Sequence, residues 1–109
     1  MYKIASIGGD GIGPEIVSEG KKVLEAAGEK FNFDTQWTDF DIGADRYLAT
    51  KKLVTEEDLA ELKKFKAIYF GSIGDDRVKP GILEKGILLA LRFHFDQYVN
   101  LRPIRLLPG

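Results

Sequence analysis

The sequence predicts an α/β domain with a largely parallel sheet, and three observations lead to that prediction. Strand patterns and helix patterns alternate along the 109 residues, in the order strand, helix, strand, helix, strand, helix, strand. A compact apolar run, Ala67–Phe70, lies between Lys66 and Gly71, as is typical of a buried strand. Glycine-rich turns follow two of the predicted strands, where open parallel sheets place ligand-binding loops.

The first half of the chain predicts two strands and a helix between them. Tyr2–Ile7 alternates loosely and is rich in β-favouring residues, which indicates a first strand. Pro14 suits the first turn of a helix over residues 14–27, and Gly28 would end that helix. Phe31–Phe40 carries aromatic and Thr residues in near alternation and predicts a second strand. The apolar face of the helix would carry Ile16, Gly20, Val23, Leu24 and Ala27.

A capping motif marks the next helix. Residues 41–54 show no clear pattern, but Thr55 is followed three residues later by Asp58, which has the form of a capping box. We expect a short helix to begin there and to carry Leu59 and Leu62.

The last third predicts one more strand, one helix and an extended end. Ala67–Phe70 is the expected third strand, and Gly71–Gly81 follows as a loop with three glycines. Ile82–Phe95 has a helical pattern, and Tyr98–Leu106 reads as extended.

Composition excludes several classes of site and partner. The chain has no cysteine, so disulfide scaffolds and cysteine-ligated zinc are excluded, and His94 is the sole histidine. No stretch approaches the roughly 18 apolar residues of a membrane span, and the opening residues do not form a signal peptide. A net charge of −1 favours neither nucleic acid nor an anionic membrane as partner. We expect His94 to lie at a surface or at a helix end.

Charge is unevenly divided along the chain. Residues 77–109 carry six basic side chains and two acidic ones, whereas residues 1–76 carry ten basic and fifteen acidic ones. The basic residues are scattered among apolar ones, so either they form an ordinary solvated surface or a few arginines meet a small anion.

Two familiar ligand motifs are absent. Counting from Gly9, the sixth position of a dinucleotide fingerprint is Pro14 rather than glycine, and no phosphate-binding G-K-[ST] sequence follows. The turn is therefore either a tight strand-to-helix connection or a place where backbone N–H groups face an anion. The acidic segment Asp39–Asp45 is not a calcium loop, because its twelfth position is Thr50.

The region after residue 81 holds the most informative side chains. Glu84, Leu88 and Arg92 are spaced by four, so a helix would align them on one strip. Such a strip suits a ligand with apolar and anionic parts, or else Leu88 packs inward between two boundary residues. Pro103 holds Arg102 in an extended backbone, and a guanidinium among apolar residues needs an anionic partner. Two arginines near one turn could clamp a dicarboxylate.

Three motifs together resemble the β-decarboxylating dehydrogenase family, which includes isocitrate, isopropylmalate, homoisocitrate and tartrate/D-malate dehydrogenases. They are the opening Gly9–Glu15, the loop Gly71–Gly74, and Leu91-Arg92 followed by Asn100–Pro103. Their order and separations fit the family from end to end. The resemblance implies an isopropylmalate dehydrogenase-like fold, with a partial, largely parallel sheet flanked by helices.

The resemblance also implies roles for individual residues. Arg92 and Arg102 match arginines that hold the malate carboxylates, and Leu88 matches the position that contacts the isopropyl group. The corresponding helix of isocitrate enzymes offers a serine, which Gly86–Leu89 lacks. The positions that match residues near the nicotinamide cofactor are Ile12, Ile73, Gly74, Asp75 and Glu84.

The substrate's side group stays open between two branches of the family. Leu83–Gly86 and Arg92-Phe93 resemble the isopropylmalate branch, whereas Phe95–Tyr98 resembles tartrate/D-malate dehydrogenases. The family reaction is an NAD-linked oxidation of a 2-hydroxy acid, followed by loss of the β-carboxylate, with Mg or Mn as Lewis acid. For the isopropylmalate branch the product is 2-oxoisocaproate, in leucine biosynthesis.

The resemblance further implies that residues 1–109 are an incomplete, N-terminal part of a dinucleotide- and substrate-binding domain. The family's acid/base residues, metal-binding aspartates, adenine-binding segment and dimer-forming arm would lie beyond residue 109. No residue here is then expected to be catalytic or a metal ligand, and the whole enzyme would be a cytoplasmic homodimer. The alternative is a free-standing module that binds a small dicarboxylate or a nucleotide. The apolar run into Pro108-Gly109 favours an interrupted domain.

Overall fold

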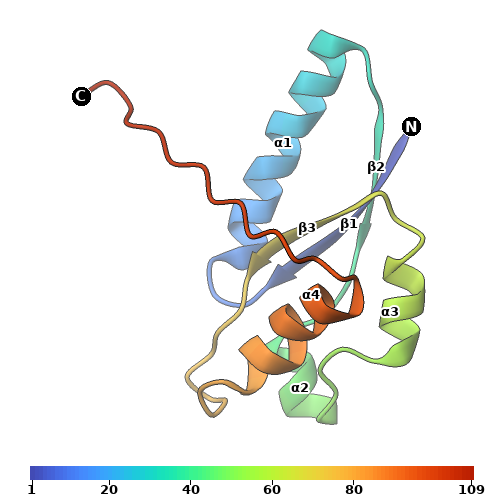
Figure 1. Ribbon diagram of the computed structural model, residues 1–109, viewed down its shortest axis with the longest axis vertical. Coiled ribbons are helices and arrows are strands. Elements are labelled where there is room, and N and C mark those ends of the chain that lie inside the picture. Colours follow the sequence, from blue (N-terminus) through green and yellow to red (C-terminus); the bar gives the residue numbers. More distant parts are fainter.

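A computed structural model describes residues 1–109 as an α/β unit with one small sheet between helices (Figure 1). No helix combines the length and the apolar character required to cross a membrane. The elements, in chain order, are β1 (Tyr2–Gly9), α1 (Gly13–Phe31), β2 (Thr35–Asp39), α2 (Ala44–Thr50), α3 (Glu56–Leu62), β3 (Ala67–Ser72), the π-helix η1 (Glu84–Leu89) and α4 (Ala90–His94).

The three strands are parallel, which confirms the predicted fold class. Their order is β2-β1-β3, so β1 is central, with Tyr2 opposite Thr35 and Ile4 opposite Ala67. Helix α1 carries the chain from β1 to β2, and α2 and α3 carry it back across β1 to β3. The connections thus leave β1 in opposite directions. In open sheets, this reversal point is where ligands bind, beyond the carboxyl ends of the strands.

Helices cover both faces of the sheet (Figure 1). Helix α1 lies on one face, and α2, α3, η1 and α4 gather on the other. The main core is on this second face, where Ala5 and Ile7 of β1 pack with side chains of the helices. The buried helical residues of this core are Ala44, Leu59, Leu62, Ile87 and Leu91.

The capping box predicted at Thr55 is confirmed. The Thr55 hydroxyl accepts a hydrogen bond from the Asp58 N–H, and the Asp58 carboxylate accepts one from the Thr55 N–H. Asp58 also pairs with Arg46 of α2. Burial would raise the pKa of Asp58, but its bonds to Arg46 and Thr55 outweigh burial and lower it.

The first helix differs from the prediction at its end and on its buried face. It continues through Gly28 to Phe31, and Asn32 ends it in a left-handed conformation, so the second strand begins at Thr35 rather than at residue 31. Gly28 is required because a Cβ there would lie 2.5 Å from the Phe33 carbonyl oxygen. The buried face carries Val17, whereas Ile16 and Val23 are exposed.

The last two differences concern segments with weak signals. Residues 41–54, which show no pattern, contain α2. The expected fourth strand over Tyr98–Leu106 is wrong, since no strand pairs with that segment. Its apolar side chains are exposed, Leu106 by 95%, so they do not enclose Arg102. The segment runs away from α4 as an unpaired tail (Figure 1).

Candidate functional site

The carboxyl ends of the three strands converge on one buried aspartate. Asp10 follows β1 directly, in a tight turn in which Gly9 and Gly11 take positive φ values of 77° and 55°. Its side chain is shielded, with 8% of the residue exposed. The Asp10 carboxylate accepts the Ala44 N–H through Oδ1 at 2.8 Å and the Gly74 N–H through Oδ2 at 3.1 Å. One side chain therefore ties together the segments that follow all three strands.

The main chain of Asp10 strengthens the same junction. Its N–H donates to the Ser72 carbonyl at 2.6 Å, and its carbonyl accepts the Gly13 N–H and the Ser72 hydroxyl, each at 2.8 Å. On the β2 side, the Ala44 N–H begins α2, whose preceding residue Gly43 has no side chain to cap it. Asp10 thus caps α2 from a distance in sequence, which satisfies an otherwise unpaired helix N–H.

Three glycines bring α1 and β3 into backbone contact at this junction. A Cβ on Gly71 would lie 2.1 Å from the Gly8 carbonyl oxygen, and one on Gly13 would lie 1.9 Å from the same atom. Real Cβ atoms do not approach so closely, so these positions leave no space for a side chain. The glycine pattern of the sequence here reflects close packing of β1, α1 and β3 as well as turn geometry.

The predicted cofactor residues of two segments, the turn after β1 and the loop after β3, lie at this junction. Ile12 occupies the position before α1, with 66% of the residue exposed, and Gly74 is exposed on the loop after β3. Ile73 is half-buried against the core. The bond from Gly74 to Asp10 joins the two loops. The structure therefore brings Ile12, Ile73 and Gly74 to the reversal point of the sheet.

Asp75 is held by a basic neighbour rather than left free. Its carboxylate accepts bonds from the Arg77 N–H, Nε and a terminal nitrogen at 2.7–2.9 Å, and Arg77 also reaches Asp45. The Arg77 side-chain bonds, which are the largest cause, lower the pKa of Asp75 to about 2. Because the Arg77 side chain is 60% exposed to solvent, this ion pair orders the loop more than it stabilises the fold.

The strip of Glu84, Leu88 and Arg92 lies beside the core, but not on one regular α-helix. Residues 84–89 form a π-helix, and the α-helical turns begin at Ala90. Leu83, Ile87 and Leu91 are buried, and each member of the strip directly follows one of them. Leu88 and Arg92 are half-buried, and Leu88 is not part of the main core. A π-helix inside a helix frequently marks a functional site.

Neither predicted arginine has an anionic partner, and Glu84 is already engaged. The Glu84 carboxylate accepts the Gly81 N–H at 2.9 Å, in the turn that precedes its own helix. Arg92 and Arg102 take part in none of the ion pairs of the structure. Arg102 lies in the exposed C-terminal segment, so the structure does not assemble the two guanidinium groups into a clamp.

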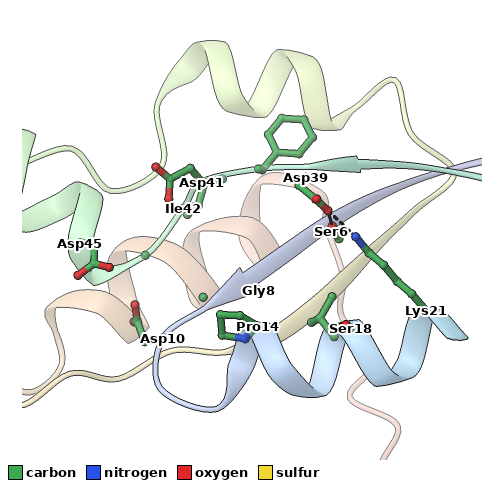
Figure 2. A pocket seen from close by; sticks show the side chains of 14 residues that line it. Ser6, Gly8, Asp10, Pro14, Ser18, Lys21, Asp39, Asp41, Ile42 and Asp45 are labelled. Carbon is green, nitrogen blue, oxygen red and sulfur yellow. Dashed lines mark hydrogen bonds and ion pairs between the residues drawn. The ribbon is translucent and has the colours of Figure 1, made fainter.

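A cleft lies between α1 and the segment after β2, and Gly8, Gly9 and Asp10 form part of its wall (Figure 2). Its volume is about 500 Å³, and none of the predicted site residues lines it. In Figure 2, Lys21 of α1 points to Asp39 at the end of β2, next to Ser6. Asp39 accepts bonds from Lys21, at 2.6 Å, and from the Ser6 hydroxyl. These bonds, that of Lys21 first, lower the pKa of Asp39.

We expect Lys21→Met to raise the pKa of Asp39 toward its usual 3.8. A lowered carboxyl pKa stabilises the fold above the unfolded-state pKa, and that contribution disappears as the pH falls through the folded-state value. Since Asp39 is 77% exposed, the loss of stability at pH 7 should stay below about 1 kcal/mol. An NMR titration of Asp39 measures the shift. Lys22→Met, which removes a pair with Glu19 instead, is the control, and equal Asp39 titrations in both variants would contradict the assignment.

The structure shows no cluster of metal-binding side chains, and its sole histidine is exposed. No cluster of three or more Asp, Glu or His residues has the geometry to hold a metal ion. His94 ends α4, is exposed and stacks edge-on against Phe95 with ring centroids 4.9 Å apart. It has the surface position at a helix end that the sequence predicts.

The central residue of the junction, Asp10, is the one that sequence reasoning missed. The available signal was an acidic residue inside a run of four glycines, directly after a strand. That signal does not say which distant N–H groups the carboxylate meets, because Ala44 and Gly74 reach it only through the fold.

Comparison with known proteins gives a consistent result. Residues 3–109 match the isocitrate/isopropylmalate dehydrogenase family. A 3-isopropylmalate dehydrogenase of Beutenbergia cavernae is 54% identical over 106 residues, which are 97% of this chain and 30% of that protein. Proteins of the same name are 48% identical in Thermobifida fusca and 52% identical in Corynebacterium glutamicum, each over 98% of this chain. This chain spans 30% and 31% of their lengths, respectively.

The fold has a counterpart among solved structures. The apo crystal structure of a β-decarboxylating dehydrogenase from Thermococcus kodakarensis superposes with a TM-score of 0.69 and 30% sequence identity. The superposition covers 90% of this chain and 28% of that one.

Proposed function

Because this chain belongs to the isocitrate/isopropylmalate dehydrogenase family, we propose that it supplies part of the active site of an NAD-dependent 3-isopropylmalate dehydrogenase. That enzyme oxidises and decarboxylates 3-isopropylmalate to 2-oxoisocaproate, in leucine biosynthesis. The observation that carries the proposal is a sequence identity of 48% to 54% with proteins of that name, over 97% to 98% of this chain. The 54% identity with the Beutenbergia cavernae protein favours the isopropylmalate branch over the tartrate/D-malate branch.

The substrate roles rest on two unpaired cations and one aliphatic side chain. Arg92 and Arg102 would each hold a carboxylate of the substrate, for which a planar guanidinium offers two parallel hydrogen bonds. Neither arginine forms an ion pair within this chain. Leu88, half-buried beside the core, would contact the isopropyl group. Arg92 and Leu88 share the η1–α4 helix, so their relative position is fixed before substrate binds.

The cofactor role belongs to the junction around Asp10. Ile12, the loop Ile73–Asp75 and Glu84 would face the nicotinamide end of NAD, which accepts the hydride from the substrate. The exposed Ile12 at the start of α1 fits this role, since it offers apolar surface directly beside helix N–H groups. Glu84 would act from the first turn of η1.

The proposal assigns Mg or Mn to the enzyme as a cofactor, but no residue of this chain to it. No three acidic or histidine side chains gather here in a metal-binding arrangement. The family resemblance also supports a homodimer in the cytoplasm that acts on a small dicarboxylate. Since the chain spans about 30% of its relatives' length, we expect it to be inactive on its own.

A chimera tests the function directly. Residues 3–109 replace the matching segment of the Beutenbergia cavernae protein, and NADH formation is followed with 3-isopropylmalate, D-malate and tartrate. We expect 3-isopropylmalate to be the best substrate. Leu88→Ser should lower the ratio of 3-isopropylmalate to D-malate activity by about 10-fold, because a polar group replaces the apolar contact.

The control for this variant is Phe93→Ser, a change on the same helix at an exposed position. It should leave the substrate ratio unchanged. A chimera that prefers tartrate or D-malate would contradict the proposed substrate. Binding of a dicarboxylate by the isolated 109-residue chain at micromolar concentration would favour a free-standing binding module instead.

A further inference from the structure

Asp10 has no assigned role in the proposed function, although it is the most connected polar side chain of the junction. Its two carboxylate oxygens accept N–H groups from segments far apart in sequence, Ala44 and Gly74. We propose that Asp10 is a positioning residue that fixes the loop Ile73–Asp75 against the Ile12 turn and thereby sets the affinity for NAD. This inference rests on the proposed function, because it assumes that both segments face the cofactor.

The environment of Asp10 explains why a carboxylate is suited to this position. A buried charge is costly unless hydrogen bonds compensate it, and here the compensation comes from peptide N–H groups rather than from a basic side chain. One of them belongs to the first residue of α2, where the helix dipole also favours negative charge. Each oxygen thus has its own donor, and the donors lie on opposite sides of β1.

Both neighbouring amides depend on this carboxylate. The N–H of Ala44 lies in the first turn of a helix, where no intrahelical acceptor exists. Gly74 lies in a loop, and no backbone carbonyl accepts its N–H. Without this carboxylate the loop after β3 would keep its Asp75–Arg77 bonds, and Ser72 would keep its bonds to the main chain of residue 10, but the bond from Gly74 would be lost.

No other acidic or amide side chain replaces Asp10. Asparagine offers one acceptor oxygen and turns its NH₂ group toward an N–H, so one of the two links is lost. Glutamate would carry its carboxylate one methylene further from the backbone, away from the positions at which both N–H groups are met. The fit also requires Gly43, because a Cβ there would lie 2.8 Å from Oδ1 of Asp10. The site is therefore matched in length and in acceptor count to aspartate.

The test compares Asp10→Asn with Ser72→Ala. Ser72→Ala removes the hydrogen bond from the Ser72 hydroxyl to the Asp10 carbonyl, at the same junction, but leaves the carboxylate intact. In the chimera described above, we expect Asp10→Asn to raise the KM for NAD about tenfold, while kcat and the KM for 3-isopropylmalate change less than about twofold. Ser72→Ala should leave all three constants within about twofold. An unchanged KM for NAD in Asp10→Asn, or an equal rise in both variants, would overturn the positioning role.

Amide hydrogen exchange in the 109-residue chain provides a readout that does not depend on catalysis. In the unsubstituted chain, Gly74 should exchange at least tenfold more slowly than Asp76, an exposed residue of the same loop. Equal exchange rates at these two amides would overturn the inference even if Asp10→Asn failed to fold. A folded chimera that reduces no NAD with any of the three substrates would instead contradict the proposed function, so the two failures are distinguishable.

Discussion

Gly71→Ala is expected to cost about 3 kcal/mol of folding free energy or more, and so to unfold much of the chain at room temperature. The new Cβ would lie 2.1 Å from the Gly8 carbonyl oxygen and 2.9 Å from that of Gly13. Both obstacles are backbone atoms, so no side-chain rotation relieves the clash. Strand β3 or helix α1 would have to move, and the junction around Asp10 would open.

Gly11→Ala is the matched control for this prediction. Gly11 also stands in the junction and has a positive φ of 55°, but nothing lies within 4 Å of its Cβ position. Its replacement therefore costs backbone strain alone, about 1 kcal/mol. Urea unfolding followed by the fluorescence of Trp37, the only tryptophan, measures both variants. Equal unfolding midpoints would show that the close approach of α1 and β3 is not a constraint on the fold.

The largest effect on activity is expected from Arg92→Ala and Arg102→Ala. Each change removes the bidentate partner of one substrate carboxylate, so we expect kcat/KM for 3-isopropylmalate in the chimera to fall at least about 100-fold. Folding stability should change by less than about 1 kcal/mol, because neither guanidinium is paired within this chain and Arg102 is exposed.

Two further substitutions sharpen the test of the arginine pair. Arg105→Ala removes an exposed cation three residues beyond Arg102 and should leave kcat/KM within about threefold. Arg102→Lys keeps the charge but loses the planar fork, and should recover only part of the activity. Steady-state kinetics together with urea unfolding separate the two quantities. Unchanged kinetics with 3-isopropylmalate in both alanine variants would show that these arginines do not hold the substrate.

The elements that the sequence predicts well are those whose signals are local. The strand at Tyr2–Ile7 and the capping box at Thr55 follow from short patterns that need no distant partner. Gly28 misleads for the opposite reason. Glycine commonly ends a helix, but here it lies within one, because Phe33 passes too close for any side chain.

Features that depend on tertiary contacts are the ones that the sequence does not predict. Ile16 and Val23 have the spacing of a buried face but are exposed, whereas Val17 is buried. Gly20, Leu24 and Ala27 of the predicted face are half-buried, and Gly20 packs against Tyr69 of β3. The apolar, extended character of Tyr98–Leu106 is typical of a strand, but a strand also requires a neighbour, and none is present. The link between Asp10 and Gly74 depends on where two loops meet.

The all-parallel order of the sheet has a consequence for how the chain acquires its structure. Pairing of β1 with β2 joins residue 2 to residue 35, and pairing with β3 joins residue 4 to residue 67, so no hairpin is available to begin the sheet. Each pair of strands can form only after the long segment between them has closed into a loop, and this closure costs chain entropy before the hydrogen bonds of the pair compensate for it. Folding should therefore be slow for a chain of this size, with the separated strands transiently exposed. During synthesis, the edge of β1 that pairs with β3 stays uncovered at least until residue 67 has left the ribosome.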